Sequence, residues 1–218
     1  MKIINLSRED SVLNHYIQEI RDEVIQQEPI RFRKNLERIG EFFAFEISKK
    51  LDYKSKETKT PLGETECRVL SNNIVLATIL RAGLPMHQGM LNVFDHAQNA
   101  FVSAYRRHHK DGSFDVKVEY SSSPSLDDKV LIISDPMLAT GHSMVLTYNE
   151  LLRKGKPAAT HIVSVVASTQ GIEELKKKVR DKNITLWIAA LDEELTAQAY
   201  IVPGLGDAGD LAYGMKED

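Results

Sequence analysis

A loop that follows an apolar run has the residue types of a phosphate site. The run Val130–Ser134 leads into Asp135-Pro-Met-Leu-Ala-Thr-Gly-His-Ser143, and a helical pattern comes next. Gly141 lets the backbone approach a ligand closely, Thr140 and Ser143 offer hydroxyl groups, and the free amides at a helix start attract an anion. Because the loop has neither the Gly-Lys-Ser/Thr ending of an ATPase loop nor a GxGxxG pattern, it predicts a phosphate site without a lysine.

Asp135 is a carboxylate beside this predicted phosphate site, where it would repel a bare anion. A ligand that presents hydroxyl groups or metal-neutralised charge to Asp135 removes the repulsion. The loop therefore favours a ribose phosphate whose sugar hydroxyls face Asp135. The alternative is an ordinary strand-to-helix turn with a Ser cap and a turn-favouring Asp-Pro pair.

An arginine follows a second apolar run. Ile79-Leu-Arg-Ala-Gly-Leu84 places Arg81 and the flexible Gly83 directly after that run. Since the carboxyl ends of parallel strands meet at one edge of a sheet, we expect Arg81 near the loop that begins at Asp135. An arginine at this place suits a second anionic group.

A segment near the end of the chain is rich in glycine. Tyr200-Ile-Val-Pro-Gly-Leu-Gly-Asp-Ala-Gly-Asp210 predicts close contact between backbone atoms and a small flat ligand. Residues 192–218 hold seven acidic residues and one lysine, a net charge of -6 that disfavours a bare polyphosphate. The segment therefore fits a neutral base bound by backbone hydrogen bonds, with Asp207 facing a magnesium-bound pyrophosphate.

Short apolar runs predict the framework that positions these segments. Runs that are fully or nearly fully apolar, rather than alternating, are typical of strands buried on both faces of a largely parallel sheet in an α/β protein. Ligands bind at the carboxyl ends of such strands. The expected strands are Ile74–Leu80, Ala100–Tyr105, Val130–Ser134, His161–Ala167 and Ile184–Ala190, and the expected helices between the later ones are Met144–Lys154 and Ile172–Val179.

The first fifty residues have the three-and-four spacing of amphipathic helices. Ser11 is the predicted cap of the first helix, and Pro29 closes that helix or opens the next one. We expect residues 1–52 to form a helical segment that packs on a single domain spanning all 218 residues. The stretch Lys54–Glu66 is expected to be a polar connector.

The composition of the chain excludes several classes of protein. Hydrophobic residues make up 42% and charged residues 27%, which is ordinary for a globular protein and unlike a disordered chain. A net charge of -3 supplies no general field for nucleic acid or an anionic membrane, so neither is an expected partner. The lone Cys67 cannot form an intramolecular disulfide, which fits a cytoplasmic protein, and no apolar run approaches the length of a signal sequence or a membrane span.

These segments together resemble the uracil phosphoribosyltransferases, a family with the type I phosphoribosyltransferase fold. The most specific matches are Asp135–Gly141 and Tyr200–Asp210, and Ile79–Gly83 supports them. The resemblance implies an α/β fold with a mostly parallel twisted sheet flanked by helices, an N-terminal helical segment and a hairpin or hood region. It also implies a reaction, in which uracil and 5-phosphoribosyl 1-pyrophosphate give uridine monophosphate and pyrophosphate in the presence of Mg²⁺.

The resemblance also implies roles for residues in the matched motifs. Arg106, Asp135 and Asp207 are expected to be catalytic, and Mg²⁺ is expected to be held by the pyrophosphate and water rather than directly by side chains. Uracil is expected to contact Tyr200, Ile201, Gly206, Asp207 and Ala208, mainly through backbone atoms. The phosphoribosyl donor is expected to contact Arg81, Arg106, Asp135, Pro136, Met137, Leu138, Ala139, Thr140, Gly141, His142, Ser143 and Asp207.

The chain departs from the family pattern in places. Val118–Ser125 replaces a characteristic segment after Arg106, which leaves the conformation of the loop covering the site open. His142 stands where glycine is common, and Leu211 stands where a basic residue is frequent. A hydrophilic hairpin tip is expected at His108–Gly112.

Two other functions stay open from the residues alone. One is a non-catalytic homologue that senses uridine monophosphate or the phosphoribosyl donor, and the other is a transferase for a different base. Retention of the residues expected to bind the donor and uracil favours the enzyme, and the glycine-rich segment disfavours another base. The family further implies a homodimer or homotetramer and GTP as an effector, neither of which the residues decide.

Overall fold

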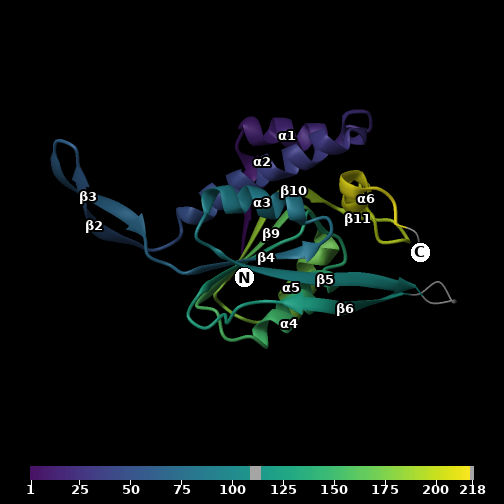
Figure 1. Cartoon of the computed structure of the whole chain (residues 1–218). Helices are drawn as coiled ribbons and strands as arrows, with labels where there is room; N and C mark the ends of the chain where they lie inside the picture. Colours follow the sequence, from purple (N-terminus) through teal and green to yellow (C-terminus); the bar gives the residue numbers. More distant parts are fainter. Residues whose placement is uncertain (109–113, 217–218) are drawn as a thin grey trace.

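One twisted sheet forms the centre of the molecule, which is described from a computed structural model (Figure 1). The structure describes residues 1–108 and 114–216, with side chains for all of these except residues 105–108 and 114–117. The strands of the sheet are β1 (Lys2–Asn5), β4 (Ile74–Leu80), β5 (Gln98–His108), β6 (Phe114–Ser122), β7 (Val130–Ser134), β8 (Met137–Leu138), β9 (Ala159–Ser168) and β10 (Ile184–Asp192). Their order is β1-β10-β9-β7-β4-β5-β6, with β8 paired to β9. Every neighbouring pair is parallel except β5 with β6.

Helices cover both faces of this sheet (Figure 1). Alternate residues of β4 point to opposite faces: Leu76 joins the core that includes the helices α1 to α3, whereas Val75 and Ala77 join the core that includes α4 and α5. Because both faces are buried, the strand is apolar except for Thr78, as the sequence predicted. The helices are α1 (Val12–Arg21), α2 (Pro29–Ser48), α3 (Leu84–Val93), α4 (His142–Leu152), α5 (Thr169–Lys178) and α6 (Ala208–Tyr213), with short 3-10 turns at Leu6–Arg8 and Ile25–Gln27.

The predicted central elements are confirmed, with small differences at their ends. β4 and β7 have the predicted bounds, whereas β5, β9 and β10 extend beyond them. α4 begins at His142 rather than Met144, because Gly141 adopts a left-handed φ of 80° and turns the chain directly into the helix.

The N-terminal residues form the predicted helical pair. Ser11 Oγ accepts a hydrogen bond from the Leu13 amide at 3.3 Å and so caps α1. Pro29 opens the second helix, where its missing amide hydrogen leaves no backbone bond unmade. The strand β1 was not predicted, because its four residues are too few to show a pattern. The buried stripe of α2 consists of Phe32, Leu36, Ile39, Phe43, Ala44 and Ile47.

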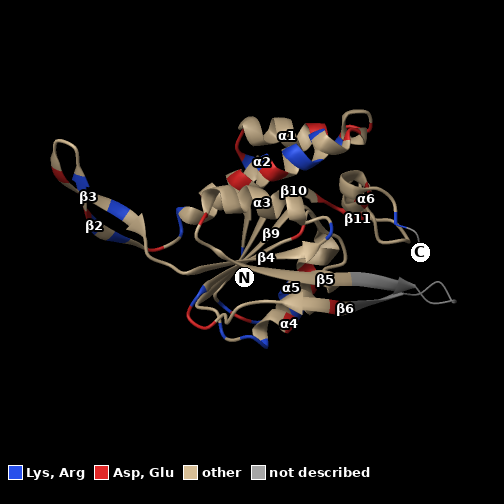
Figure 2. Ribbon diagram, viewed as in Figure 1, with Lys and Arg blue, Asp and Glu red and all other residues tan. Residues whose placement is uncertain are grey.

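The prediction of a polar connector at Lys54–Glu66 was wrong. These residues belong to a hairpin of β2 (Tyr53–Thr60) and β3 (Gly63–Leu70), which projects away from the sheet (Figure 1). Most of its residues are exposed and none is buried, and charges of both signs lie along it (Figure 2). A hairpin without a buried face has no apolar alternation, so the pattern that usually indicates strands is missing.

The second hairpin joins β5 to β6. Val118–Ser122 form the end of β6, so this part of the segment expected to be a loop is a strand. β5 ends at His108, and the rest of the predicted tip, residues 109–112, lies outside the described residues. In the described part of the chain, no helix combines the length and the apolarity needed to cross a membrane.

Candidate active site

The loop after β7 runs beside β9 before α4 begins. The Asp135 amide donates to Val163 O at 3.1 Å, and Pro136 O accepts from the Val165 amide at 3.0 Å. Met137–Leu138 form β8, which pairs with β9. Backbone hydrogen bonds therefore fix this loop at the carboxyl end of the sheet, with Asp135 partly exposed.

The start of α5 supports the second half of the same loop. Ser168 Oγ donates to Ala139 O at 2.5 Å and accepts from the Gly171 amide at 2.9 Å. A side-chain carbon at Gly171 would collide with the carbonyl oxygens of Leu138 and Ala139. The sequence analysis missed Ser168 and Gly171, because no local pattern reveals their contact with a loop far away in the chain.

The first turn of α4 faces the end of this loop. No side chain caps α4 at Gly141, so the first amides of the helix remain able to bind an anion. Thr140 and Ser143 are partly exposed on either side of Gly141, and His142 is exposed with its Nε2 3.9 Å from Glu174 Oε1. Hydroxyl groups and free amides thus lie together here.

Arg81 lies at the same edge of the sheet. Because β4 and β7 are neighbours, a side-chain carbon at Gly83 would lie 3.1 Å from Ser134 O at the end of β7. Arg81 Nη2 donates to Asp210 Oδ1 at 3.0 Å and to Gly214 O at 3.2 Å. The structure therefore brings together the three segments that the sequence analysis singled out.

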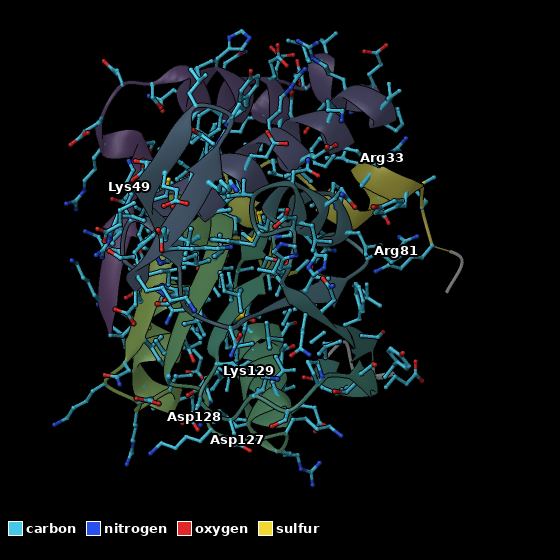
Figure 3. The ribbon with its side chains drawn as sticks, turned by 60° about the vertical axis from the view of Figure 1, so that its left-hand side comes forward. Arg33, Lys49, Arg81, Asp127, Asp128 and Lys129 are labelled. Carbon is cyan, nitrogen blue, oxygen red and sulfur yellow. The ribbon has the colours of Figure 1, made fainter. Side chains whose placement is uncertain are left out.

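A second arginine, which the sequence analysis did not select, also contacts α6. Arg33 Nη1 donates to Ala212 O at 2.6 Å, and its guanidinium lies 5.9 Å from the ring centre of Tyr213. Arg33 and Arg81 approach α6 from different sides (Figure 3). Burial raises the pKa of the Tyr213 hydroxyl, while the two arginines oppose that shift.

Asp207 caps α6 and leaves part of its carboxylate available. Oδ1 accepts from the amides of Gly209 at 2.8 Å and Asp210 at 3.0 Å, and Oδ2 has no hydrogen-bond partner among the described residues. Gly206 has a left-handed φ of 87°, and a side-chain carbon there would meet only Leu211 Cδ1 at 3.9 Å. The backbone at Gly206 and Asp207 is therefore open to a flat ligand.

The other residues predicted to contact uracil flank Gly206 and Asp207 in the sequence: Tyr200 and Ile201 precede them, and Ala208 follows. A short antiparallel pair, β11 (Glu194–Leu195) and β12 (Ile201–Val202), precedes Gly206. Ile201 and Ala208 are only 4% and 3% exposed as whole residues, so the open backbone of this segment is the one at Gly206. Tyr200 is 40% exposed.

Residues of the N-terminal segment hold the glycine-rich backbone in place. Arg21 binds Asp192 through two hydrogen bonds of 3.0 Å, and Asp192 Oδ2 accepts the Gly204 amide at 2.9 Å. With its side-chain nitrogen facing this segment, Gln26 donates to Leu205 O at 2.8 Å. The sequence analysis missed these residues too, since their contacts join opposite ends of the chain.

Arg106 lies in β5 opposite Val116 of β6, and its side chain is outside the described ones. Across residues 1–108 and 114–216, no group of three or more His, Cys, Asp or Glu side chains is arranged to hold a metal ion.

Comparison with known proteins identifies the family to which this chain belongs. Residues 7–215 match the family described as uracil phosphoribosyltransferase. The chain belongs to the uracil phosphoribosyltransferase family. A relative named uracil phosphoribosyltransferase from Porphyromonas gingivalis is 55% identical over 216 residues, which cover 99% of this chain and 100% of the relative. One of the same name from Pyrococcus furiosus is 37% identical over 204 residues, covering 91% of this chain and 86% of that protein.

Solved structures share the fold of this member of the uracil phosphoribosyltransferase family. The AQ2163 protein from Aquifex aeolicus has a TM-score of 0.86 at 30% identity, covering 97% of this chain and 98% of its own. The adenine phosphoribosyl transferase from Trypanosoma brucei has a TM-score of 0.55 at 11% identity and covers 90% of this chain and 87% of its own, which shows a shared fold alone. The resemblance and the type I phosphoribosyltransferase fold expected from the sequence are confirmed.

Proposed function

We propose that the protein transfers the 5-phosphoribosyl group of 5-phosphoribosyl 1-pyrophosphate to uracil, releasing uridine monophosphate and pyrophosphate. The observation that carries this proposal is the 3.0 Å contact between Arg81 and Asp210. It joins the loop after β4 to the glycine-rich segment, while Gly83 packs on the end of β7. An anion-binding arginine, a phosphate loop and an open backbone therefore meet at one edge of the sheet.

The loop from Asp135 to Ser143 binds the ribose 5-phosphate part of the donor. The first amides of α4 and the hydroxyls of Thr140 and Ser143 surround the phosphate, which a helix start favours electrostatically. Asp135 accepts hydrogen bonds from the ribose hydroxyls, so its negative charge contributes to binding of the phosphoribosyl donor.

The pyrophosphate binds to Arg81 and Arg106. In the reaction, the bond from the anomeric carbon to the pyrophosphate oxygen breaks, a bond to a uracil ring nitrogen forms, and that nitrogen releases its proton to water. The sugar becomes cation-like during this displacement, so the rate gain comes from positioning the reactants and from stabilising the leaving group. Arg106, Asp135 and Asp207 are the catalytic residues of this proposal.

Uracil binds beside Gly206, where the left-handed backbone leaves open space. Backbone atoms of Ile201, Gly206 and Ala208 bind its carbonyl oxygens and ring nitrogen, since the open backbone at Gly206 lets a flat ring approach closely. Backbone hydrogen bonds to the carbonyl oxygens make the ring nitrogen a better nucleophile. Tyr200 and Asp207 lie on either side of the base.

Mg²⁺ fits the proposed active site as an ion bound to the phosphoribosyl donor. Carboxylate oxygens suit Mg²⁺, and the free Oδ2 of Asp207 is of this type. When bound, the ion would be held by the pyrophosphate and water, and Asp207 would contact it through water. It would supply positive charge that neutralises the leaving pyrophosphate.

The chain forms one domain of residues 1–218, because α1 and α2 share a core with the central sheet.

Membership of the family supports further proposals about the protein in the cell. It acts in the cytoplasm as a homodimer or homotetramer, and GTP is an effector. Size-exclusion chromatography with light scattering tests the assembly, and activity measured with and without GTP tests the effector.

An assay of uridine monophosphate formation tests the main proposal. The protein is given the phosphoribosyl donor and Mg²⁺ with uracil, cytosine, hypoxanthine or orotate in separate reactions. We expect turnover with uracil alone. The Asp207→Asn variant keeps an oxygen to cap α6, and we expect it to lose most of the activity while it stays folded.

Two results would redirect the proposal. Turnover with another base in place of uracil would contradict the uracil assignment. No turnover with any base, together with tight binding of uridine monophosphate or the donor, would support a non-catalytic ligand-sensing homologue.

A further inference from the structure

A cavity of about 400 Å³ lies at the amino ends of the parallel strands, opposite the edge that holds the proposed active site. The first residues of β1, β7, β9 and β10 line it, together with the residues that connect α2 to the β2–β3 hairpin. Lys50 is one of these connecting residues. Its neighbour Lys49 and the active-site residue Arg81 lie on opposite sides of the molecule (Figure 3).

The cavity is lined by more positive than negative charge. Lys2, Lys50 and Lys182 line it, are exposed, and have no ion-pair partner among the described residues. Asp52 is the one carboxylate in the lining, and it already accepts a hydrogen bond from the Asn72 side chain at 3.2 Å. A ligand here therefore meets two units of excess positive charge, which favours an anion.

A buried histidine supplies a hydrogen-bond donor to the same cavity. Trp187 Nε1 donates to His161 Nδ1 at 3.0 Å, so the proton of the neutral ring is on Nε2. His161 is 6% exposed and lines the cavity, and its Nε2 has no partner among the described residues. Burial lowers the pKa of His161 to about 4, so the ring is neutral at pH 7 and this donor is always present.

We propose that this cavity binds a small molecule through a phosphate group, with Lys50, Lys182 and His161 Nε2 as its donors. Lysine ammonium groups bind phosphate as point charges, and a histidine N–H without a protein partner can donate a hydrogen bond to a phosphate oxygen. A volume of about 400 Å³ lies in the range of small-molecule sites. Three lysines and a neutral donor suit a doubly charged phosphate better than a single carboxylate.

The fluorescence of Trp187 can report ligand binding in this cavity. Trp187 is the only tryptophan of the chain, lines the cavity and bonds to His161, so its fluorescence reports events there. We would titrate the protein with inorganic phosphate, pyrophosphate or adenosine monophosphate at constant ionic strength and follow Trp187 emission. A saturable change is expected, and the comparison of the three probes shows whether inorganic phosphate or a phosphorylated metabolite is the ligand.

Matched variants make the test specific. The double variant Lys50→Gln/Lys182→Gln should weaken binding by about tenfold or more, since it removes two charge-assisted contacts. The double variant Lys176→Gln/Lys177→Gln on α5 makes the same change of charge at exposed positions away from the cavity and should bind like the wild type. Arg81→Gln, which disturbs the proposed active site, should also leave the Trp187 signal intact.

The proposal fails if Trp187 emission shows no saturable change with any of the three probes. It also fails if Lys50→Gln/Lys182→Gln binds as tightly as the wild type, or if Arg81→Gln abolishes the signal and so assigns it to the active site. None of these outcomes depends on whether the protein forms uridine monophosphate.

Discussion

Arg21 on α1 and Asp192 at the end of β10 form a two-pronged ion pair that also fixes Gly204. The pair has two hydrogen bonds of 3.0 Å, Asp192 is 8% exposed, and Arg21 lies 3.4 Å from Gly204 O. The Gly204 amide donates to the same carboxylate at 2.9 Å. An N-terminal helix therefore determines where the backbone that we propose binds uracil is placed.

This relationship predicts that Arg21→Lys raises the KM for uracil by about tenfold and leaves the KM for the phosphoribosyl donor within about twofold. Lysine keeps the charge but cannot make the two-pronged contact with Asp192, so the Gly204 backbone loses its support. Steady-state kinetics with each substrate varied in turn measures the split.

A second arginine in the same helical pair serves as the control for Arg21→Lys. Arg31 also makes a two-pronged contact, at 2.8 and 2.6 Å to Glu19, but this contact lies within the helical pair and not at the glycine-rich segment. Arg31→Lys should therefore leave both KM values unchanged. An equal rise of both KM values in Arg21→Lys would show a general loss of structure instead of a positioning effect.

We expect Arg81→Lys to lower kcat/KM for the phosphoribosyl donor by about 10- to 100-fold, because lysine keeps the charge but cannot present the several N–H donors of a guanidinium to the leaving pyrophosphate. Arg33→Lys is the matched control, since Arg33 contacts α6 through Ala212 O and lies outside the proposed pyrophosphate site. If the two variants lose the same activity, the role of Arg81 is to hold α6 and not to bind the donor.

A substitution at Gly171 tests the phosphate loop, because Gly171 packs against the backbone of that loop. Gly171→Ala places a methyl group against the carbonyl oxygens of Leu138 and Ala139 and must displace the loop. We expect kcat/KM for the phosphoribosyl donor to fall by about tenfold or more. Gly63→Ala, at the turn of the β2–β3 hairpin where a methyl group meets nothing within 4 Å, should keep full activity. Unchanged kinetics in Gly171→Ala would show that the loop tolerates displacement.

The parts of the fold that follow from local pattern could be predicted from the sequence. β4 and β7 are buried on both faces, so they are apolar except for Thr78 and Ser134, and their predicted bounds are correct. The rule that parallel strands share a carboxyl edge correctly predicts that Arg81 lies at the same edge as Asp135. The β2–β3 hairpin buries almost nothing, so its strands have no apolar pattern to find.

The supporting residues of the site could not be predicted for a different reason. Arg21, Arg33 and Gly171 act through contacts with backbone atoms far away in the chain, and such contacts depend on how whole elements pack. A charged residue on an amphipathic helix has the same local pattern whether it faces water or a distant loop. The apolar spacing of α1 and α2 indicates which face is buried, but not which polar residue borders the active site.

The ion pair between Glu19 and Arg31 predicts a loss of stability in acid. Hydrogen bonds from Arg31 and then Asn35 lower the pKa of Glu19 from 4.5 to about 2 in the folded protein. The unfolded chain therefore takes up this proton first, so the stabilisation is present above pH 4.5 and is lost as the pH falls toward 2. In denaturant titrations, Glu19→Gln should be less stable than the wild type at pH 6, and the difference in unfolding free energy should shrink between about pH 5 and pH 3.

Glu46→Gln, which breaks an exposed pair with Lys49, should change the unfolding free energy by no more than about 1 kcal/mol throughout. A difference for Glu19→Gln that stays constant over this range would show that its carboxylate charge does not stabilise the fold.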